Sequence, residues 1–323
     1  MRVFINGFGR IGRSVLRAWA LHPDHWPGLE IVGINDIATP EICAYLFGYD
    51  SVFGPWPGPV VAENGVLAFG PHRIPLHRVE DLSCLDISHV DVVMECTGRA
   101  ESRAVAERGL RGGAGRVLIS GPSAAADAVV VLGANDELLA DQPILSNASC
   151  TTNALAPLLK LLDQRFGAVT GTMTTIHCYT GSQPTVDAPR GKGGLDDFAR
   201  SRAAALSMVP TTTSAGRLVG QVLPHLAGRV IAQAVRVPTA SVSAVDLAVM
   251  PAQPVTVEAV NAAFTGAAEL LGPGILGSTT LPLVSTDLRA RPESVVMALP
   301  ETRVTEGGML RVFGWYDNEW GFS

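Results

Sequence analysis

Cys150 is the residue best placed in this sequence to act as a nucleophile. It lies in the segment SNASCTTN, residues 146–153, directly before an apolar stretch with helical spacing, and Ser149 is a plausible N-cap. Unpaired backbone N–H groups and the helix dipole stabilise an anion there, and such placements can lower a cysteine pKa to roughly 3.5–7.5. The placement predicts a reactive thiolate, with a small buried cysteine as the alternative.

A thiol nucleophile needs a group that accepts its proton, and His177 is the candidate base. It lies in the segment TTIHCYT, at the end of a predicted strand, and it is the one among seven histidines that stands in a dense run of polar side chains. A hydrogen-bonded histidine in the core is the alternative. The sequence leaves open whether the two side chains meet.

A glycine-rich segment near the N-terminus predicts a dinucleotide site. Gly7, Gly9 and Gly12 form a GxGxxG pattern between a strand expected at residues 2–6 and the helix that follows. The first glycine permits a tight turn, the second lets the backbone approach a pyrophosphate, and the third allows close helix packing. A glycine-rich turn without a ligand is the alternative interpretation.

Asp36 indicates which dinucleotide the site prefers. It ends the second expected strand, where its carboxylate can accept hydrogen bonds from ribose hydroxyls and repel a 2′-phosphate. The sequence therefore predicts NAD rather than NADP, unless Asp36 only forms a turn.

Hydroxyl and guanidinium side chains stand on or near expected loops and strand ends in the second half of the chain. They are Thr180, Arg200, Arg236 and the threonines of residues 211–213. Such donors commonly bind phosphate, and arginine adds planar bidentate geometry. We expect an anionic substrate, although the hydroxyls can instead cap a helix and the arginines can be ordinary surface residues.

The elements around the glycine pattern indicate an α/β domain of the Rossmann type. Strands at residues 2–6 and 30–35 enclose a helix, which is a βαβ unit, and Asn64 with Gly65 predicts a type I′ hairpin inserted after it. Short apolar segments then supply further strands of the first sheet, at residues 90–95, 116–120, 128–132 and 144–146.

Beyond Cys150 the pattern changes to that of an α+β domain. A helix is expected at about residues 151–166, followed by long alternating segments at 167–179, 229–237 and 241–250. Long amphipathic strands favour a mixed or antiparallel sheet with one face buried under helices. The domain boundary is therefore placed near Cys150.

Length and composition support two folded domains and small-molecule chemistry. A chain of 323 residues exceeds the ~250–300 that one hydrophobic core usually serves. A net charge of -6 gives no reason to expect nucleic acid or an anionic membrane as a partner. The five cysteines are widely spaced without a CxxC pair, which argues against disulfides and against a structural metal site. With no export signal and no apolar run of ~18 residues, a cytoplasmic location is expected.

Five segments in this order resemble the glyceraldehyde-3-phosphate dehydrogenase family: NGFGRIGR, SNASCTTN, PTTTSAG, RVPTASVSAVDLAV and WYDNEWGFS. The resemblance extends over nearly the whole chain. It implies an NAD-binding domain at residues 1–149, a catalytic domain with a mixed, mainly antiparallel sheet at 150–315, and a return of the chain to the first domain at about 316–323. A homotetramer is also implied.

The resemblance assigns roles to individual residues. Cys150 would be the nucleophile and His177 its activator. The NAD site would be lined by the three glycines and by Asn6, Arg10, Ile11, Asp36, Arg78, Thr97, Ser120 and Asn318. Inorganic phosphate would be held by Ser149, Thr151, Arg200 and Thr213, with Ser214 next to it, and the substrate phosphate by Thr180 and Arg236.

The implied reaction is attack of the Cys150 thiolate on an aldehyde, hydride transfer to NAD while His177 accepts the hydroxyl proton, and attack of inorganic phosphate on the thioester. Two alternatives stay open. A related enzyme could oxidise another phosphorylated aldehyde, such as erythrose 4-phosphate, and release the acid with water. A catalytically idle NAD-binding paralogue is the other. Ser182, Ser214, Phe322 and the long loop at residues 189–200 depart from the usual family pattern.

Overall fold

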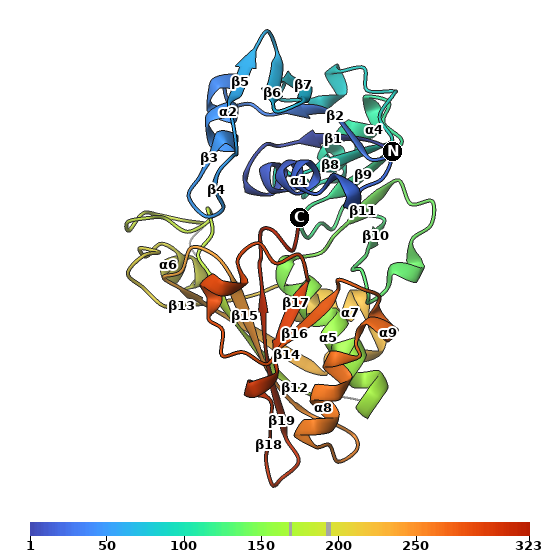
Figure 1. Ribbon diagram of the computed structural model, residues 1–323, viewed down its shortest axis with the longest axis vertical. Coiled ribbons are helices and arrows are strands. Elements are labelled where there is room, and N and C mark those ends of the chain that lie inside the picture. The colour runs from blue at the N-terminus through green and yellow to red at the C-terminus, as the bar shows by residue number, and fades with distance from the viewer. Residues whose placement is uncertain (168–169, 192–194) are drawn as a thin grey trace. The chain divides into compact units, whose positions relative to one another are not determined.

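The computed structural model describes residues 1–167, 170–191 and 195–323. Two compact units can be separated along the chain (Figure 1). The first comprises residues 1–130, 138–148 and 323, and the second comprises residues 131–137 and 149–322. Parts of the expected strand at 167–179 and of the loop at 189–200, namely residues 168–169 and 192–194, lie outside the described residues.

The C-terminal residues group differently from the sequence-based division. Residues 316–322 belong to the second unit, whereas the division placed 316–323 with the first domain. The reason lies in their side chains, because Tyr316 and Asn318 form hydrogen bonds with residues of the second sheet.

The first unit is built around a mostly parallel sheet. Its strands are β1 (Arg2–Asn6), β2 (Glu30–Asn35), β5 (Val60–Glu63), β6 (Val66–Phe69), β7 (His72–His77), β8 (Val92–Glu95), β9 (Arg116–Ile119), β10 (Ala128–Val129) and β11 (Ile144–Ser146). The order across the sheet is β10-β11-β9-β8-β1-β2-β7-β6-β5, and within the described residues only the pairs β5/β6 and β6/β7 are antiparallel. Strand β1 therefore lies between β2 and β8, where the chain reverses its direction of winding.

Helices cover the two faces of this sheet. They are α1 (Arg10–Leu21), α2 (Pro40–Gly48), α3 (Arg103–Ala106) and α4 (Arg108–Arg111), and a small ribbon is formed by β3 (Tyr49–Asp50) and β4 (Gly54–Pro55). One core includes Val3, Leu16 and Phe47, and the other includes Phe4 and Val117. Neighbouring β1 residues thus point into opposite cores, as the alternation of a strand requires.

The predicted hairpin is confirmed. Asn64 and Gly65 connect β5 to β6 with φ of 52° and 74°. Both values are positive, which is the backbone that a type I′ turn requires and that Asn and Gly adopt most readily. The predicted α/β class with a Rossmann-type first domain is also confirmed.

The second unit contains a mixed, mainly antiparallel sheet. Its strands are β12 (Thr170–Cys178), β13 (Val209–Thr211), β14 (Val230–Val237), β15 (Ser243–Met250), β16 (Leu276–Thr279), β17 (Val295–Ala298), β18 (Arg303–Val304) and β19 (Leu310–Tyr316). The order is β13-β14-β12-β15-β19-β17-β16, with β18 paired to β19. Among the described strands of this sheet, only the pairs β12/β14 and β16/β17 are parallel, as the sequence pattern predicts for an α+β domain.

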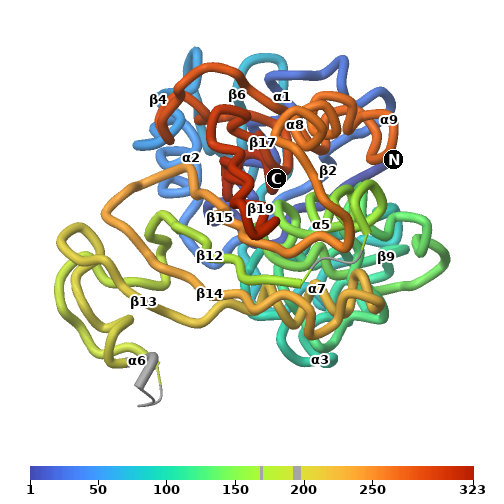
Figure 2. Tube along the Cα trace, turned by 90° about the horizontal axis from the view of Figure 1, so that it is seen from below, coloured from blue at the N-terminus to red at the C-terminus, as the bar shows by residue number. Residues whose placement is uncertain are grey.

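The helices of this unit gather on one side of the sheet (Figures 1 and 2). They are α5 (Cys150–Phe166), α7 (Ala215–Val222), α8 (Val257–Thr265) and α9 (Ala268–Leu271), while the short α6 (Leu195–Arg200) precedes β13. Helix α5 contacts α7, β15 and β17, and residues 151–159 along it are buried. Its first turn, which carries Cys150, is therefore held by the core of the unit.

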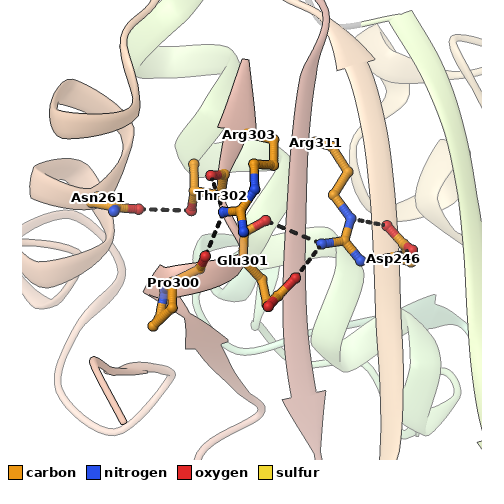
Figure 3. Close-up of polar contacts among 7 residues, drawn as sticks. All are labelled: Asp246, Asn261, Pro300, Glu301, Thr302, Arg303 and Arg311. Atoms are coloured by element: carbon orange, nitrogen blue, oxygen red, sulfur yellow. Dashed lines mark hydrogen bonds and ion pairs between the residues drawn. The ribbon is translucent and has the colours of Figure 1, made fainter. Parts of the chain in front are cut away.

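The outer face of the sheet carries a polar network near β19 (Figure 3). Arg311 forms ion pairs with Asp246 of β15 at 2.7 Å and with Glu301 at 2.9 Å. A hollow of about 310 Å³ lies next to it, lined mainly by apolar residues such as Leu281 and Trp315. Among the described residues its lining contains no nucleophile, and its single arginine is paired with two carboxylates.

No described helix is both long and apolar enough to cross a membrane. Within residues 1–167, 170–191 and 195–323, no group of three or more histidine, cysteine or acidic side chains could hold a metal ion.

Candidate active site

Cys150 and His177 face each other in the second unit. Cys150 opens α5, where the Ser149 hydroxyl caps the helix by accepting a hydrogen bond from the Thr152 N–H at 3.1 Å. His177 lies near the end of β12, and its Nε2 atom is 3.6 Å from the Cys150 Sγ atom. The structure thus brings together the two side chains that the sequence singled out separately.

The neighbouring backbone fixes the tautomer of His177. Its Nδ1 atom lies 2.6 Å from the carbonyl oxygen of Cys178. A carbonyl oxygen only accepts hydrogen bonds, so Nδ1 carries the proton. In the neutral imidazole Nε2 is therefore unprotonated, and its lone pair points to the thiol. His177 is set to accept a proton from Cys150.

Burial favours the neutral form of both partners. Burial raises the pKa of the Cys150 thiol to about 11, and hydrogen bonds from Thr151 and from the Cys150 backbone act more weakly in the opposite direction. Burial also lowers the pKa of His177. Desolvation of the thiolate thus opposes the lowering of the thiol pKa that the helix N-terminus favours. The contact with Nε2 offers a route to the thiolate by proton transfer to His177.

Tyr316 lies behind this pair and was not identified from the sequence. Its hydroxyl lies 2.9 Å from Thr151 Oγ1 and 2.8 Å from Thr175 Oγ1, which joins α5, β12 and the end of β19. Its ring meets the His177 ring edge to face at 6.0 Å. The segment WYDNE contains it, but nothing local in that segment indicates that the hydroxyl reaches Thr151.

Thr180, Ser182 and Arg236 form one cluster of donors. Arg236 on β14 pairs in register with His177 on β12, and its Nη1 atom donates to Ser182 Oγ at 3.0 Å. The Thr180 and Ser182 hydroxyls are 2.9 Å apart. Burial lowers the pKa of Arg236, and the positive charge of Arg200 adds to this. The cluster places a guanidinium and two hydroxyls next to the strand that carries His177.

Arg200 and the threonine triplet form a second cluster. Arg200 Nε donates to Thr211 Oγ1 at 2.7 Å, and Nη2 lies 3.4 Å from the Thr212 carbonyl and hydroxyl oxygens. Thr213 Oγ1 accepts from the Ala215 N–H at 3.2 Å, and Ser214 is the N-cap residue of α7. The sequence left open that these hydroxyls cap a helix. The Thr213 hydroxyl does accept one N–H at the start of α7.

The first unit has a cavity of about 250 Å³ at the carboxyl ends of β1, β2 and β8. Five predicted NAD-site residues line it, namely Asn6, Gly7, Gly9, Asp36 and Thr97. Five others are absent from its lining, namely Arg10, Ile11, Gly12, Arg78 and Ser120. Asn318 belongs to the second unit, where its Oδ1 atom accepts hydrogen bonds from Cys178 and Ser243.

The glycines of the GxGxxG segment fit the roles that a dinucleotide requires. A Cβ atom on Gly12 would lie 2.2 Å from the Gly7 carbonyl oxygen, so α1 packs against the turn in a way that only glycine allows. A Cβ atom on Gly9 would meet nothing within 4 Å, which leaves room for a pyrophosphate near the start of α1. Asp36 accepts hydrogen bonds from the Phe8 and Ala38 N–H groups at 2.6 and 2.8 Å, so its carboxylate is fixed at this turn.

A row of buried side chains, joined by hydrogen bonds, forms part of the cavity wall. Asn35 Nδ2 donates to Asn6 Oδ1 at 2.8 Å, Asn6 Nδ2 donates to Glu95 Oε2 at 2.5 Å, and the Thr97 N–H donates to Glu95 Oε1 at 3.0 Å. Asn35 and Glu95 were not identified from the sequence. Their position at the ends of β2 and β8 was the available signal, because neighbouring parallel strands end at the same edge.

Comparisons with known proteins agree along the whole chain. A family model described as "Glyceraldehyde 3-phosphate dehydrogenase, NAD binding domain" matches residues 1–103, and one described as the "C-terminal domain" matches residues 149–318. The chain is similar to proteins named glyceraldehyde-3-phosphate dehydrogenase from Cereibacter sphaeroides, at 46% identity, and Xanthobacter flavus, at 45%. A relative of the same name from Pseudomonas aeruginosa is 44% identical. Each match covers 100% of this chain and 95% of the relative.

Proposed function

The chain belongs to the glyceraldehyde-3-phosphate dehydrogenase family, and we propose that it oxidises glyceraldehyde 3-phosphate with NAD and inorganic phosphate to 1,3-bisphosphoglycerate. The observation that carries this proposal is the contact between Cys150 Sγ and the unprotonated Nε2 of His177 at 3.6 Å. It supplies a nucleophile and a base in one place.

The first step is attack of Cys150 on the aldehyde carbon. His177 Nε2 takes the thiol proton, a C–S bond forms, and the carbonyl π electrons move to the oxygen. His177 then returns its proton to this oxygen, which becomes the hydroxyl of the hemithioacetal. Proton transfer within the pair avoids a permanent thiolate in a buried site, which suits a thiol pKa of about 11. The N–H of Cys150, at the start of α5, is the proposed donor to the developing oxyanion.

The second step turns the hemithioacetal into a thioester. His177, neutral again, accepts the hydroxyl proton while the carbon loses a hydride. NAD, when bound, supplies the hydride acceptor. The cavity lined by Asn6, Gly7, Gly9, Asp36 and Thr97 is the proposed site for it, and residues 1–148 without 131–137 form the proposed NAD-binding domain.

The third step releases the acyl group. An oxygen of inorganic phosphate attacks the thioester carbon, a C–O bond forms, and the C–S bond breaks to return the Cys150 thiolate. We propose that Ser149, Thr151, Arg200, Thr213 and Ser214 hold this phosphate. Thr180 and Arg236 hold the phosphate of the substrate, and Ser182 contributes a neutral hydroxyl through its contacts with both.

We further propose a homotetramer in the cytoplasm. Ile176, Ile231 and Met250 lie on the sheet face opposite the helices and are 37%, 70% and 47% exposed. Apolar side chains on one exposed sheet face are typical of a surface that contacts another chain. Light scattering tests this, and a monomer in solution would contradict it.

The proposed reaction is tested by NADH formation from glyceraldehyde 3-phosphate with and without inorganic phosphate. We expect turnover that requires phosphate, because the thioester is otherwise released only by slow hydrolysis. Equal turnover without phosphate would favour a hydrolytic dehydrogenase. No turnover with this aldehyde, combined with turnover of erythrose 4-phosphate, would reassign the substrate.

The Asp36→Ala variant should lose preference for NAD over NADP. The carboxylate is fixed at the cavity by two N–H groups, so its charge opposes a bound 2′-phosphate. We expect kcat/KM for NAD divided by kcat/KM for NADP to fall about 10- to 100-fold, because the variant loses the repulsion between one carboxylate and the 2′-phosphate. Asp24→Ala, at an exposed aspartate outside the cavity lining, is the control. An unchanged ratio would show that Asp36 only forms the turn.

A further inference from the structure

Tyr316 and two threonines form a buried row of hydroxyl groups beside the nucleophile. Thr151 belongs to the first turn of α5, Thr175 to β12, and Tyr316 ends β19. The Tyr316 hydroxyl lies between the two threonine hydroxyls, 2.9 Å from Thr151 Oγ1 and 2.8 Å from Thr175 Oγ1. Each of the three residues is at most 4% exposed, so water does not compete for these hydrogen bonds.

One end of this row reaches the Cys150 sulfur. Thr151 follows Cys150 in the chain, and its side chain forms a hydrogen bond with the thiol group that favours the thiolate. A thiolate has no hydrogen, so it accepts this bond and Thr151 Oγ1 donates it. A threonine hydroxyl has only one hydrogen to donate. Thr151 Oγ1 must therefore be the acceptor in its contact with Tyr316.

The direction of the other hydrogen bonds follows from this end. The Tyr316 hydroxyl donates its single hydrogen to Thr151, so it accepts from Thr175. All three hydroxyl hydrogens thus point along the row towards the sulfur. Hydrogen bonds aligned in this way strengthen one another in a protein interior. When the thiol proton moves to His177, a donor to the thiolate is already in place.

We propose that Tyr316 is a positioning residue, which holds the Thr151 hydroxyl so that it donates to the Cys150 thiolate. This inference rests on the proposed function, in which that thiolate is the nucleophile. Without the Tyr316 hydroxyl, Thr151 loses the donor that reserves its own hydrogen for the sulfur. Once the thioester has formed, the sulfur carries no negative charge, and the Thr151 hydroxyl is then available to the inorganic phosphate.

Tyr316 acts through a hydrogen bond and not through a charge. Burial raises the pKa of its phenol, so the hydroxyl stays neutral throughout the pH range of the experiment. Tyr316→Phe removes this hydroxyl and keeps the ring that meets the His177 ring edge to face. The other titratable or charged groups that act on the Cys150 thiol stay in place, namely His177, Cys178, Arg236 and Glu319.

The experiment measures the rate at which iodoacetamide alkylates Cys150 as a function of pH, without aldehyde, NAD or phosphate. Peptide mass identifies the modified thiol, and the thiolate is the form that reacts. Tyr316→Phe should lower the rate at neutral pH about 3- to 10-fold, the effect of one hydrogen bond, and displace the profile to higher pH. Tyr45→Phe, at an exposed tyrosine of the first unit, is the matched control and should keep the original profile.

Two substitutions of Thr151 test whether Tyr316 acts through this residue. Thr151→Val keeps the shape of the side chain and removes the hydroxyl, whereas Thr151→Ser keeps the hydroxyl. Adding Tyr316→Phe should lower the alkylation rate about 3- to 10-fold in the Thr151→Ser protein and change it less than about 2-fold in the Thr151→Val protein. A purely structural role of Tyr316 would instead lower the rate equally in both.

The outcomes separate this inference from the proposed function. If Tyr316→Phe has the alkylation profile of Tyr45→Phe, the positioning role is overturned. An equal effect of Tyr316→Phe in the two Thr151 proteins would also overturn it. Because no aldehyde or NAD takes part, the expected alkylation pattern in a protein without turnover would contradict only the proposed reaction. A thermal unfolding curve for each variant confirms that the proteins compared are folded.

Discussion

The Cys150→Ser variant should lose at least about 10³-fold in kcat/KM for the aldehyde, because no other group can form the covalent intermediate. A serine hydroxyl is far less acidic than a thiol, and His177, whose pKa is lowered by burial, is a weak base for removing its proton. The initial rate of NADH formation under saturating NAD and phosphate measures the loss.

The control for this experiment is Cys84→Ser. Cys84 is an exposed free thiol in the first unit, so the same substitution there removes a thiol without touching the site. We expect it to keep the activity of the unmodified protein. Binding of NAD should also persist in Cys150→Ser, which distinguishes loss of chemistry from loss of folding. Activity of Cys150→Ser within tenfold of the control would exclude Cys150 as the nucleophile.

The first domain could be predicted from sequence because its signals are local. A GxGxxG segment between a strand and a helix, and an Asn-Gly turn between apolar strands, each fix the backbone over a few residues. The position of β7 could not be predicted in this way. It pairs in parallel with β2 after the hairpin, and that pairing depends on residues far apart in the chain.

The individual residues of the site could be predicted from the sequence, but their contacts with one another could not. Cys150 and His177 have recognisable positions at a helix start and a strand end, but only the packing of α5 on the sheet brings them to 3.6 Å. The sequence shows the helix terminus, which favours a lowered thiol pKa, and hides the burial of Cys150, which raises that pKa. Tyr316, Glu95 and Ser243 were missed since their partners lie on other strands.

The second large effect is expected for the His177→Asn variant, because the His177 tautomer leaves Nε2 free to accept the thiol proton. Asparagine fills a similar space and cannot accept the thiol proton, so kcat/KM at neutral pH should fall about 10²- to 10⁴-fold. The variant then depends on thiolate formed by ionisation alone. With a thiol pKa of about 11, its activity should rise roughly tenfold per pH unit across the neutral range.

The unmodified protein should show the opposite profile. The neutral imidazole is the active form, and burial lowers the pKa of His177, so activity is complete at neutral pH and falls only below the ordinary histidine pKa of about 6.5. Profiles of kcat/KM from about pH 5 to about pH 9.5 compare the two. His225→Asn, at an exposed histidine beside Asp163, should keep the original profile. An acid limb retained in His177→Asn would assign the base to another group and leave the contact with Cys150 without a catalytic role.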